Sequence, residues 1–128
     1  MANVRILESL QQEDRGTAIM FGFGSNSFSI NQEDFLKKAA EGAHIIDVRS
    51  PEEFAQGNLK KSKNIPLNMM GTHLNEFKKY AENKEVVLLI CLSGSRSAMA
   101  HKFLTKNNLA DQVFDLSGGI SRWKGPLK

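Results

Sequence analysis

The 128-residue chain is poor in several features that would settle its class at once: it has one cysteine, three prolines and one tryptophan. A single cysteine, Cys91, excludes an intrachain disulfide and any cysteine metal cluster supplied by this chain alone. The longest apolar run, residues 86–92, is far shorter than the roughly 18 residues that cross a bilayer, so we expect no membrane span. The N-terminal segment lacks the order of a signal peptide, and a reducing cytoplasm is the expected location.

Charge is nearly balanced, because 17 lysines and arginines stand against 14 acidic residues and leave a net charge of +3. The densest basic group, residues 60–63, is interrupted and isolated, whereas a nucleic-acid site needs a basic patch or stripe on one face. His44 and His73 have no partners at the spacing of a metal site. We therefore expect no nucleic-acid partner and no metal, and only a mild attraction for small anions.

The first 26 residues are weakly patterned, with helical spacings near the start and a short strand expected at residues 18–23. Glycines and serines at residues 22–27 indicate a joint. We therefore divide the chain into an N-terminal extension or edge decoration, residues 1–26, and a main domain, residues 27–128. The extension could instead dock a partner, and its sequence does not decide between these roles.

From Phe28 onward, short apolar runs alternate with helical patterns. Asn31 and Ser50, the latter followed by Pro51, are predicted helix caps. Helices are expected at residues 32–40, 72–80 and 95–106, with a brief helix starting at residue 51, and strands at residues 43–48, 64–67, 86–90 and 112–116. This alternation predicts an α/β fold with a parallel sheet and helices on both faces. Ligands bind beyond the carboxyl ends of the strands in such sheets, and Cys91 follows the strand that looks most buried.

The most informative segment is the loop between that strand and the next helix, which reads Cys-Leu-Ser-Gly-Ser-Arg-Ser. Small residues let the backbone curl so that successive amide groups point at one centre, and a nearby helix N-terminus attracts anions. Cys91 at this centre is the candidate nucleophile, as a stabilised thiolate. The candidate substrate-binding residues are Leu92, Ser93, Gly94, Ser95, Arg96 and Ser97, with Arg96 adding positive charge at the rim. The alternative is a free cysteine that packs as a small hydrophobe.

Four blocks of the sequence resemble the signatures of the single-domain rhodaneses, a family of sulfurtransferases, over most of the chain. The blocks are Ile45-Ile46-Asp47-Val48-Arg49-Ser50-Pro51-Glu52-Glu53-Phe54, then Asn64-Ile65-Pro66-Leu67, then Cys91 through Ser97, and finally Leu116-Ser117-Gly118-Gly119 with Trp123. The third block resembles the family's six-membered active-site loop, here Cys91 to Arg96. The resemblance implies a rhodanese-like fold, with a five-stranded, mainly parallel sheet flanked by helices.

The resemblance also implies a chemistry. Cys91 would attack the outer sulfur of a donor such as thiosulfate, release sulfite and keep the sulfur as a persulfide. A thiol or cyanide acceptor would then remove it, so that catalysis is covalent and has two steps. The backbone amides of residues 92–97 would stabilise the sulfur anion. No metal or organic cofactor is implied.

Two departures from the family pattern bear on this reading. The family's Gly-His-Ile-x-Gly-Ala run is replaced by residues 57–62, which lack the histidine and the second glycine, and this puts the local loop conformation in doubt. The active-site loop carries a single basic side chain, Arg96, whereas a dianion such as thiosulfate prefers more positive charge. A protein persulfide or another small donor is therefore an alternative substrate.

Other functions fit parts of the pattern. A cysteine phosphatase also uses a cysteine loop between a strand and a helix. It needs a larger anion-binding loop with arginine six residues after the cysteine, and this position is Ser97 here. A non-catalytic rhodanese-like binding module commonly lacks the cysteine. A persulfide carrier with a dedicated protein partner would use the same persulfide, and the sequence does not separate it from the enzyme.

Structural roles are expected for several polar residues near the site. Asp47 and Arg49 are predicted to be structural, with Arg49, four residues before Glu53, fixing the following helix to the strand end. His101 lies two turns into the helix after the loop, which is too far to reach the sulfur, so we expect it to be packed or solvated.

Two residues near the C-terminus have open roles. Trp123 is interpreted as a plug of the core, with a lip over the pocket as the alternative. Lys124 is either an ordinary exposed lysine or a residue that recruits an anion to the pocket.

Overall fold

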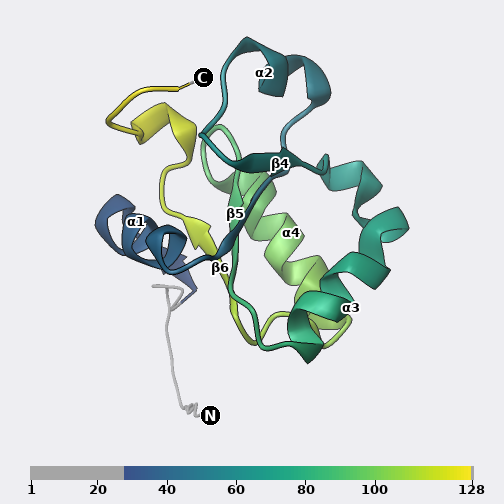
Figure 1. Ribbon diagram of the computed structural model, residues 1–128. Helices are drawn as coiled ribbons and strands as arrows, with labels where there is room; N and C mark the ends of the chain where they lie inside the picture. Colours follow the sequence, from purple (N-terminus) through teal and green to yellow (C-terminus); the bar gives the residue numbers. More distant parts are fainter. Residues whose placement is uncertain (1–27, 128) are drawn as a thin grey trace, which may run out of the picture.

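The computed structural model describes residues 28–127 and has a five-stranded sheet at its centre (Figure 1). The strand order is β2-β6-β5-β3-β4, and every strand pair is parallel. In chain order the elements are β2 (Ser29–Ile30), α1 (Gln32–Ala40), β3 (His44–Asp47), α2 (Pro51–Gln56), β4 (Ser62–Asn64), η1 (Leu67–His73), α3 (Leu74–Glu82), β5 (Val87–Ile90), α4 (Ser95–Lys106), β6 (Val113–Leu116) and η2 (Ile120–Arg122). The predicted α/β architecture with a parallel sheet is confirmed.

Helices cover both faces of the sheet, with α1 on one side and α3 and α4 on the other (Figure 1). All four residues of β5 are buried, as expected for a strand covered on both faces. Leu89 belongs to the apolar cluster that includes Leu104 of α4, whereas its neighbour Leu88 belongs to the cluster that includes Phe35 of α1. The central strand is therefore held rigidly from both sides, and it positions the residue that follows it.

Both predicted helix caps are present. The Asn31 side chain accepts a hydrogen bond from the backbone N–H of Asp34 at 2.8 Å and caps α1. Ser50 caps α2 through a capping box with Glu53, and Pro51 occupies the first helical turn. These local signals place the helix starts correctly because each side chain satisfies a backbone N–H that has no partner within its helix.

Two predicted elements are displaced along the chain, and one strand was missed. The strand predicted at residues 64–67 lies earlier, at Ser62–Asn64, because Pro66 has no N–H for the ladder and Leu67 already begins a 3-10 helix. The helix predicted from residue 72 begins at Leu74, because the 3-10 helix η1 extends to His73. β2 has only two residues, too few to show an alternating pattern.

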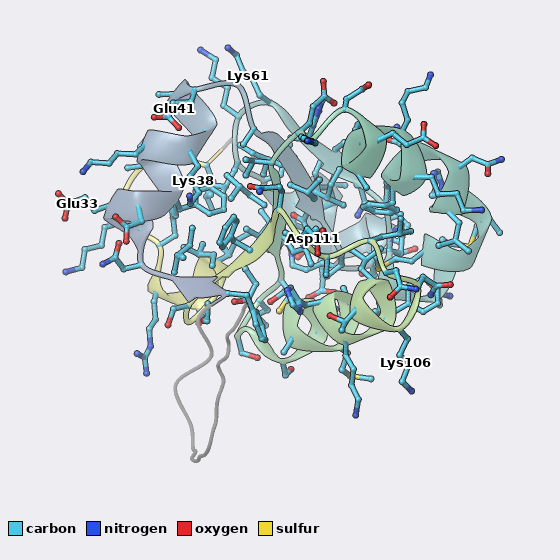
Figure 2. All side chains as sticks on the ribbon, turned by 90° about the horizontal axis from the view of Figure 1, so that it is seen from below. Glu33, Lys38, Glu41, Lys61, Lys106 and Asp111 are labelled. Carbon is cyan, nitrogen blue, oxygen red and sulfur yellow. The ribbon has the colours of Figure 1, made fainter. Side chains whose placement is uncertain are left out.

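Charged side chains project outward from the sheet and its helices (Figure 2). Lys61 and Lys106, both labelled there, lie on opposite sides of the molecule. Lys38 of α1 instead reaches back over the sheet, with its ammonium nitrogen 4.3 Å from the centre of the Phe114 ring on β6. This cation–π contact helps to fix α1 on its face of the sheet.

No helix within residues 28–127 has both the length and the apolar character needed to cross a membrane. The extension predicted for residues 1–26, with its short strand at residues 18–23, lies outside the described residues.

Lys61 occupies the position of the second glycine in the family pattern and adopts the backbone conformation that glycine favours. Its φ is 69°, in the left-handed region where a side chain costs roughly 1–2 kcal/mol. The loop thus keeps a glycine-like conformation without glycine. Lys61→Gly is therefore expected to raise the free energy of unfolding, measured in urea, by up to about 1 kcal/mol, because glycine's larger unfolded-state entropy offsets part of the gain.

Lys60→Gly is the matched control, because Lys60 is exposed and does not have a positive φ. It is expected to lower stability by roughly 0.5–1 kcal/mol. A Lys61→Gly protein less stable than the parent would show that the left-handed backbone at this position carries no cost.

Candidate active site

Cys91 directly follows β5, so its sulfur lies at the carboxyl edge of the sheet beside its central strand. In Figure 1 the connection from β5 to α4 lies beneath α2. The sequence predicted this position, which is where open parallel sheets bind their ligands.

Two backbone N–H groups converge on the sulfur. Gly94 N lies 3.0 Å from Cys91 Sγ, and Ser97 N lies 3.3 Å from it. Ser97 belongs to the first turn of α4, a helix of 12 residues, so the positive end of its dipole faces the same atom. The arrangement stabilises negative charge on sulfur, because donors and dipole are fixed before any charge forms.

Gly94 gives the loop its curvature. It occupies the N-cap position of α4 with φ 104° and ψ −14°, in the left-handed region that favours glycine. A Cβ at this position would also lie 3.6 Å from the backbone nitrogen of Gly118. The predicted role of Gly94 in turning the backbone toward the sulfur therefore agrees with the observed geometry.

The base of the loop is held by the turn that follows β6. Ile120 N donates to the carbonyl oxygen of Cys91, and Ser121 N donates to that of Leu92, each at 2.8 Å. Gly119 lies against these carbonyls so closely that a Cβ would come within 2.5 Å of both oxygens. The sequence marked this turn only as a motif of the family and gave no physical reason for it.

Arg96 does not stand as a free positive charge at the rim, which corrects the prediction. Its guanidinium makes a two-pronged ion pair with Glu53 of α2, with Nη1–Oε1 at 2.6 Å and Nη2–Oε2 at 2.9 Å. Forty-three residues separate the two partners, so no local pattern predicted the contact. The only basic residue of the loop is thus neutralised and binds the loop to α2.

The hydrogen bond from Arg96, opposed by partial burial and helped by Ser50, lowers the pKa of Glu53 to about 2. Because the pKa falls below its ordinary value of 4.5 on folding, the stabilisation is complete above about pH 4.5 and is lost as the pH falls toward 2. The ion pair therefore persists at neutral and mildly acidic pH.

Asp47 and Arg49 form the predicted structural pair, but with a different helix contact. Arg49 donates from Nη2 to Asp47 Oδ2 at 2.8 Å and to the carbonyl oxygen of Gly57 at 2.7 Å. Both side chains are buried, and the carbonyl of Gly57 lies at the end of α2. Arg49 thus fixes α2 through the carbonyl of Gly57, while Glu53 forms its ion pair with Arg96.

The remaining loop residues lie at the surface. Leu92 is 45% exposed, and Ser93 and Ser95 lie 3.4 Å apart through their hydroxyl oxygens. In the described part of the chain, the backbone donors to the sulfur are Gly94 and Ser97 rather than the whole predicted series. Cys91 itself is 0% exposed, so the sulfur is presented from below the loop and not at its open surface.

Ser97 also brings a residue to the site that the sequence reading missed. Its hydroxyl lies 3.5 Å from Cys91 Sγ and 3.2 Å from a carboxylate oxygen of Asp115 on β6. Asp115 is 3% exposed. An acidic residue in an otherwise apolar strand is the sequence signal that could have found it.

The three histidines have different surroundings. His101 is packed, with its ring stacked on Phe28 and Nε2 3.2 Å from the carbonyl oxygen of Val113; burial lowers its pKa to about 4. His44 and His73 contact glutamates, and residues 28–127 contain no cluster of three potential metal ligands.

Trp123 and Lys124 lie beside α1 rather than at the sulfur. Trp123 packs edge-on against Phe35, with ring centres 5.7 Å apart, in agreement with its interpretation as a core residue. Lys124 is exposed and is held through its backbone, which exchanges two hydrogen bonds with the Gln32 side chain.

The model of the rhodanese-like domain family matches residues 31–126. An uncharacterized Bacillus subtilis protein is 32% identical over 100 residues, which cover 78% of this chain and 75% of that protein. A sulfurtransferase of Allochromatium vinosum is 29% identical over 96 residues, 73% of this chain and 85% of the relative. The match to adenylyltransferase and sulfurtransferase MOCS3-1 of Drosophila pseudoobscura pseudoobscura, 33% identical over 74% of this chain, spans only 22% of that longer protein.

Solved structures agree with this assignment. A rhodanese-like domain protein from Staphylococcus aureus superposes with a TM-score of 0.67 at 30% identity, covering 78% of this chain and 95% of the other. The chain therefore belongs to the rhodanese-like domain family. Its sulfurtransferase relatives support a sulfurtransferase kind of enzyme.

Proposed function

We propose that the protein transfers sulfane sulfur through a persulfide on Cys91. The observation that carries the proposal is the convergence of the Gly94 and Ser97 amides on Sγ, at the N-terminus of α4. These donors favour the thiolate, which is the form of cysteine that attacks sulfur. A non-catalytic binding module would have no use for a sulfur held in this way.

The reaction has two steps. The Cys91 thiolate attacks the outer sulfur of a donor such as thiosulfate, a new S–S bond forms, and the donor's own S–S bond breaks. Sulfite then leaves with the electron pair. A thiol or cyanide attacks the outer persulfide sulfur and restores the thiolate. Each step exchanges one bond to sulfur for another, and turnover needs Cys91 in its reduced state, as in the cytoplasm.

The charge beside Arg96 affects which sulfur donor the protein prefers. Arg96 is neutralised by Glu53, and a shallow hollow beside it is lined largely by apolar atoms of residues such as Val48, Pro66 and Leu67. A dianion gains little there, whereas a donor with one charge and an apolar group gains contact area. We therefore extend the proposal to organic persulfides, including a persulfide carried by a partner protein.

Steady-state kinetics test the proposed function. With thiosulfate and cyanide varied together, we expect parallel lines in double-reciprocal plots, because sulfite leaves before cyanide enters. Intersecting lines would show direct transfer between donor and acceptor and would contradict a persulfide intermediate. Release of phosphate from an aryl phosphate is expected to be absent, and its appearance would favour the phosphatase alternative.

Glu53→Gln tests the effect of the neutralised arginine on the choice of donor. Glutamine keeps the capping box of α2 but leaves the charge of Arg96 uncompensated. We expect kcat/KM for thiosulfate to rise, by up to about tenfold at low ionic strength, because the dianion then meets a net positive rim. The value for an uncharged trisulfide donor is expected to stay unchanged.

Glu52→Gln is the matched control, because Glu52 lies on the same helix, is exposed and carries the same charge. It changes the net charge without touching Arg96 and is expected to leave both donors unaffected. An equal gain for both donors in Glu53→Gln would mean that the ion pair acts on the loop conformation and not on donor charge.

A further inference from the structure

Asp115 is a buried carboxyl with no charged partner among residues 28–127. It lies on β6 next to Ser29 of β2 and is 3% exposed. One of its oxygens, Oδ1, has no hydrogen-bond partner in the part of the chain that the structure describes. Within residues 28–127 no lysine or arginine lies at ion-pair distance from it. A buried carboxylate in such a place bears the full cost of desolvation, whereas the neutral acid does not.

Ser97 connects this carboxyl to the reactive sulfur. Its hydroxyl oxygen lies 3.2 Å from Asp115 Oδ2, 3.1 Å from the carbonyl oxygen of Gly94 and 3.5 Å from Cys91 Sγ. Ser97 is 0% exposed, so these three groups are the neighbours that share its hydroxyl. A change at Asp115 is therefore transmitted to the sulfur through one hydroxyl group.

The number of protons that the Ser97 hydroxyl can donate favours one state of this network. The Ser97 hydroxyl has one proton, and the carbonyl of Gly94 and the Cys91 thiolate can only accept. If Asp115 were also ionised, three acceptors would compete for one proton. If Asp115 keeps its proton, it donates to the Ser97 oxygen, and the Ser97 proton is free to point toward the sulfur anion.

The surroundings of Asp115 agree with a neutral acid. Burial raises its pKa, and its contacts with Ser29 and Ser97 only partly oppose this. On α4, Ser97 is the residue that contacts Asp115. His101 lies one turn further along the same helix and is uncharged at neutral pH, because burial lowers its pKa to about 4. β2 contributes Ser29, and the loop after β5 contributes Cys91.

We propose that Asp115 is a positioning residue for the reactive sulfur: as a neutral acid it donates to Ser97, whose hydroxyl then donates to the Cys91 thiolate. The proposal rests on the proposed function only in taking Cys91 as the reactive sulfur. Linked hydrogen bonds strengthen one another, so the acid also makes Ser97 a better donor. When Asp115 is ionised, the Ser97 hydroxyl donates to the carboxylate instead of to the sulfur. The carboxylate also places a second negative charge near the sulfur.

The experiment is a pH titration of the thiolate absorbance of the resting protein, without any sulfur donor. Cys91 is the only cysteine, so the signal belongs to one residue. The single tyrosine, Tyr80, does not interfere near neutral pH, because burial and its bond to Glu76 raise its pKa well above the ordinary value.

Three variants give distinct expected results. Asp115→Asn keeps a neutral group that can donate to Ser97, and the titration midpoint is expected to stay within about 0.3 pH unit of the parent. Ser97→Ala is expected to raise the midpoint by about one pH unit, because it removes a hydrogen bond to a charged acceptor. Asp115→Ala is expected to shift it in the same direction by less.

Two results would overturn the proposal. A midpoint that falls by about one pH unit or more in Asp115→Asn would show that Asp115 is charged while the sulfur ionises. An unchanged midpoint in Ser97→Ala would show that the hydroxyl does not act on the sulfur. This result tests the proposal even if Asp115→Ala fails to fold. The titration needs no turnover, so loss of sulfur transfer with the expected midpoints would refute the proposed function and leave this role standing.

Discussion

Gly119→Ala is expected to destabilise the protein and to disrupt the loop that holds the sulfur. Gly119 has φ 63° and ψ −163°, a combination that is essentially restricted to glycine. A Cβ there would lie 2.5 Å from the carbonyl oxygens of Cys91 and Leu92, which are backbone atoms that cannot rotate away. Backbone strain and overlap together are expected to cost roughly 2–6 kcal/mol of unfolding free energy.

The same substitution is expected to reduce sulfur transfer even where the protein stays folded. The Gly119 turn carries Ile120 and Ser121, whose N–H groups hold the carbonyls of Cys91 and Leu92. A displaced turn no longer holds these carbonyls, and the N–H groups of Gly94 and Ser97 then no longer point at the sulfur. We expect kcat/KM to fall by at least about tenfold, since small misplacements at a reacting centre are costly.

Two other glycines provide the controls, measured by urea unfolding. Gly42 also has a positive φ, 103°, but a Cβ there meets nothing within 4 Å, so Gly42→Ala reports backbone strain alone. Gly71 has neither feature, and Gly71→Ala is expected to be tolerated. If Gly119→Ala costs no more than Gly42→Ala, the close approach of the turn to the loop has no energetic weight.

Local signals in the sequence predicted the fold well where the physics is local. The helix expected at residues 95–106 has those bounds, and Asn31 and Ser50 cap their helices as predicted, because a cap depends on neighbours three residues away. β4 was misplaced because its pairing with β3 is set by backbone hydrogen bonds at an edge, not by an apolar pattern.

The candidate site was predicted in position but not in its electrostatics. A strand followed by a small-residue loop and a helix indicated where Cys91 lies, and no pattern in the loop reveals that Arg96 is paired with Glu53. Asp115 and Ser97 are 18 residues apart and meet only because β6 lies beside β5. Contacts of this kind follow from the sheet order, which the sequence did not specify.

Burial of the sulfur has a consequence for reactivity. Cys91 is 0% exposed, so a donor reaches Sγ only when the segment after it moves outward. Leu92, at 45% exposed, lies on the outer side of that segment. The resting loop thus shields the sulfur from adventitious oxidation, while the hydrogen bonds from Ile120 and Ser121 to the carbonyls of Cys91 and Leu92 hold the base of the loop in place.

Cys91→Ser is expected to abolish sulfur transfer, with a loss of at least about a thousandfold in kcat/KM for thiosulfate. Serine has nearly the same shape and leaves the two amide donors in place, but an alcohol is a far weaker nucleophile toward sulfur than a thiol. Thermal unfolding of the variant should match the parent, which separates loss of the nucleophile from loss of the fold. Substantial residual transfer would place the reacting sulfur elsewhere.

The most direct test of the central claim is the intact mass of the protein after treatment with thiosulfate. The parent is expected to gain the mass of one sulfur atom and to lose it again on addition of cyanide. Cys91→Ser, which has no cysteine, is expected to gain nothing. A parent protein that gains no sulfur from thiosulfate or from an organic persulfide, or a variant that gains as much as the parent, would contradict a persulfide on Cys91.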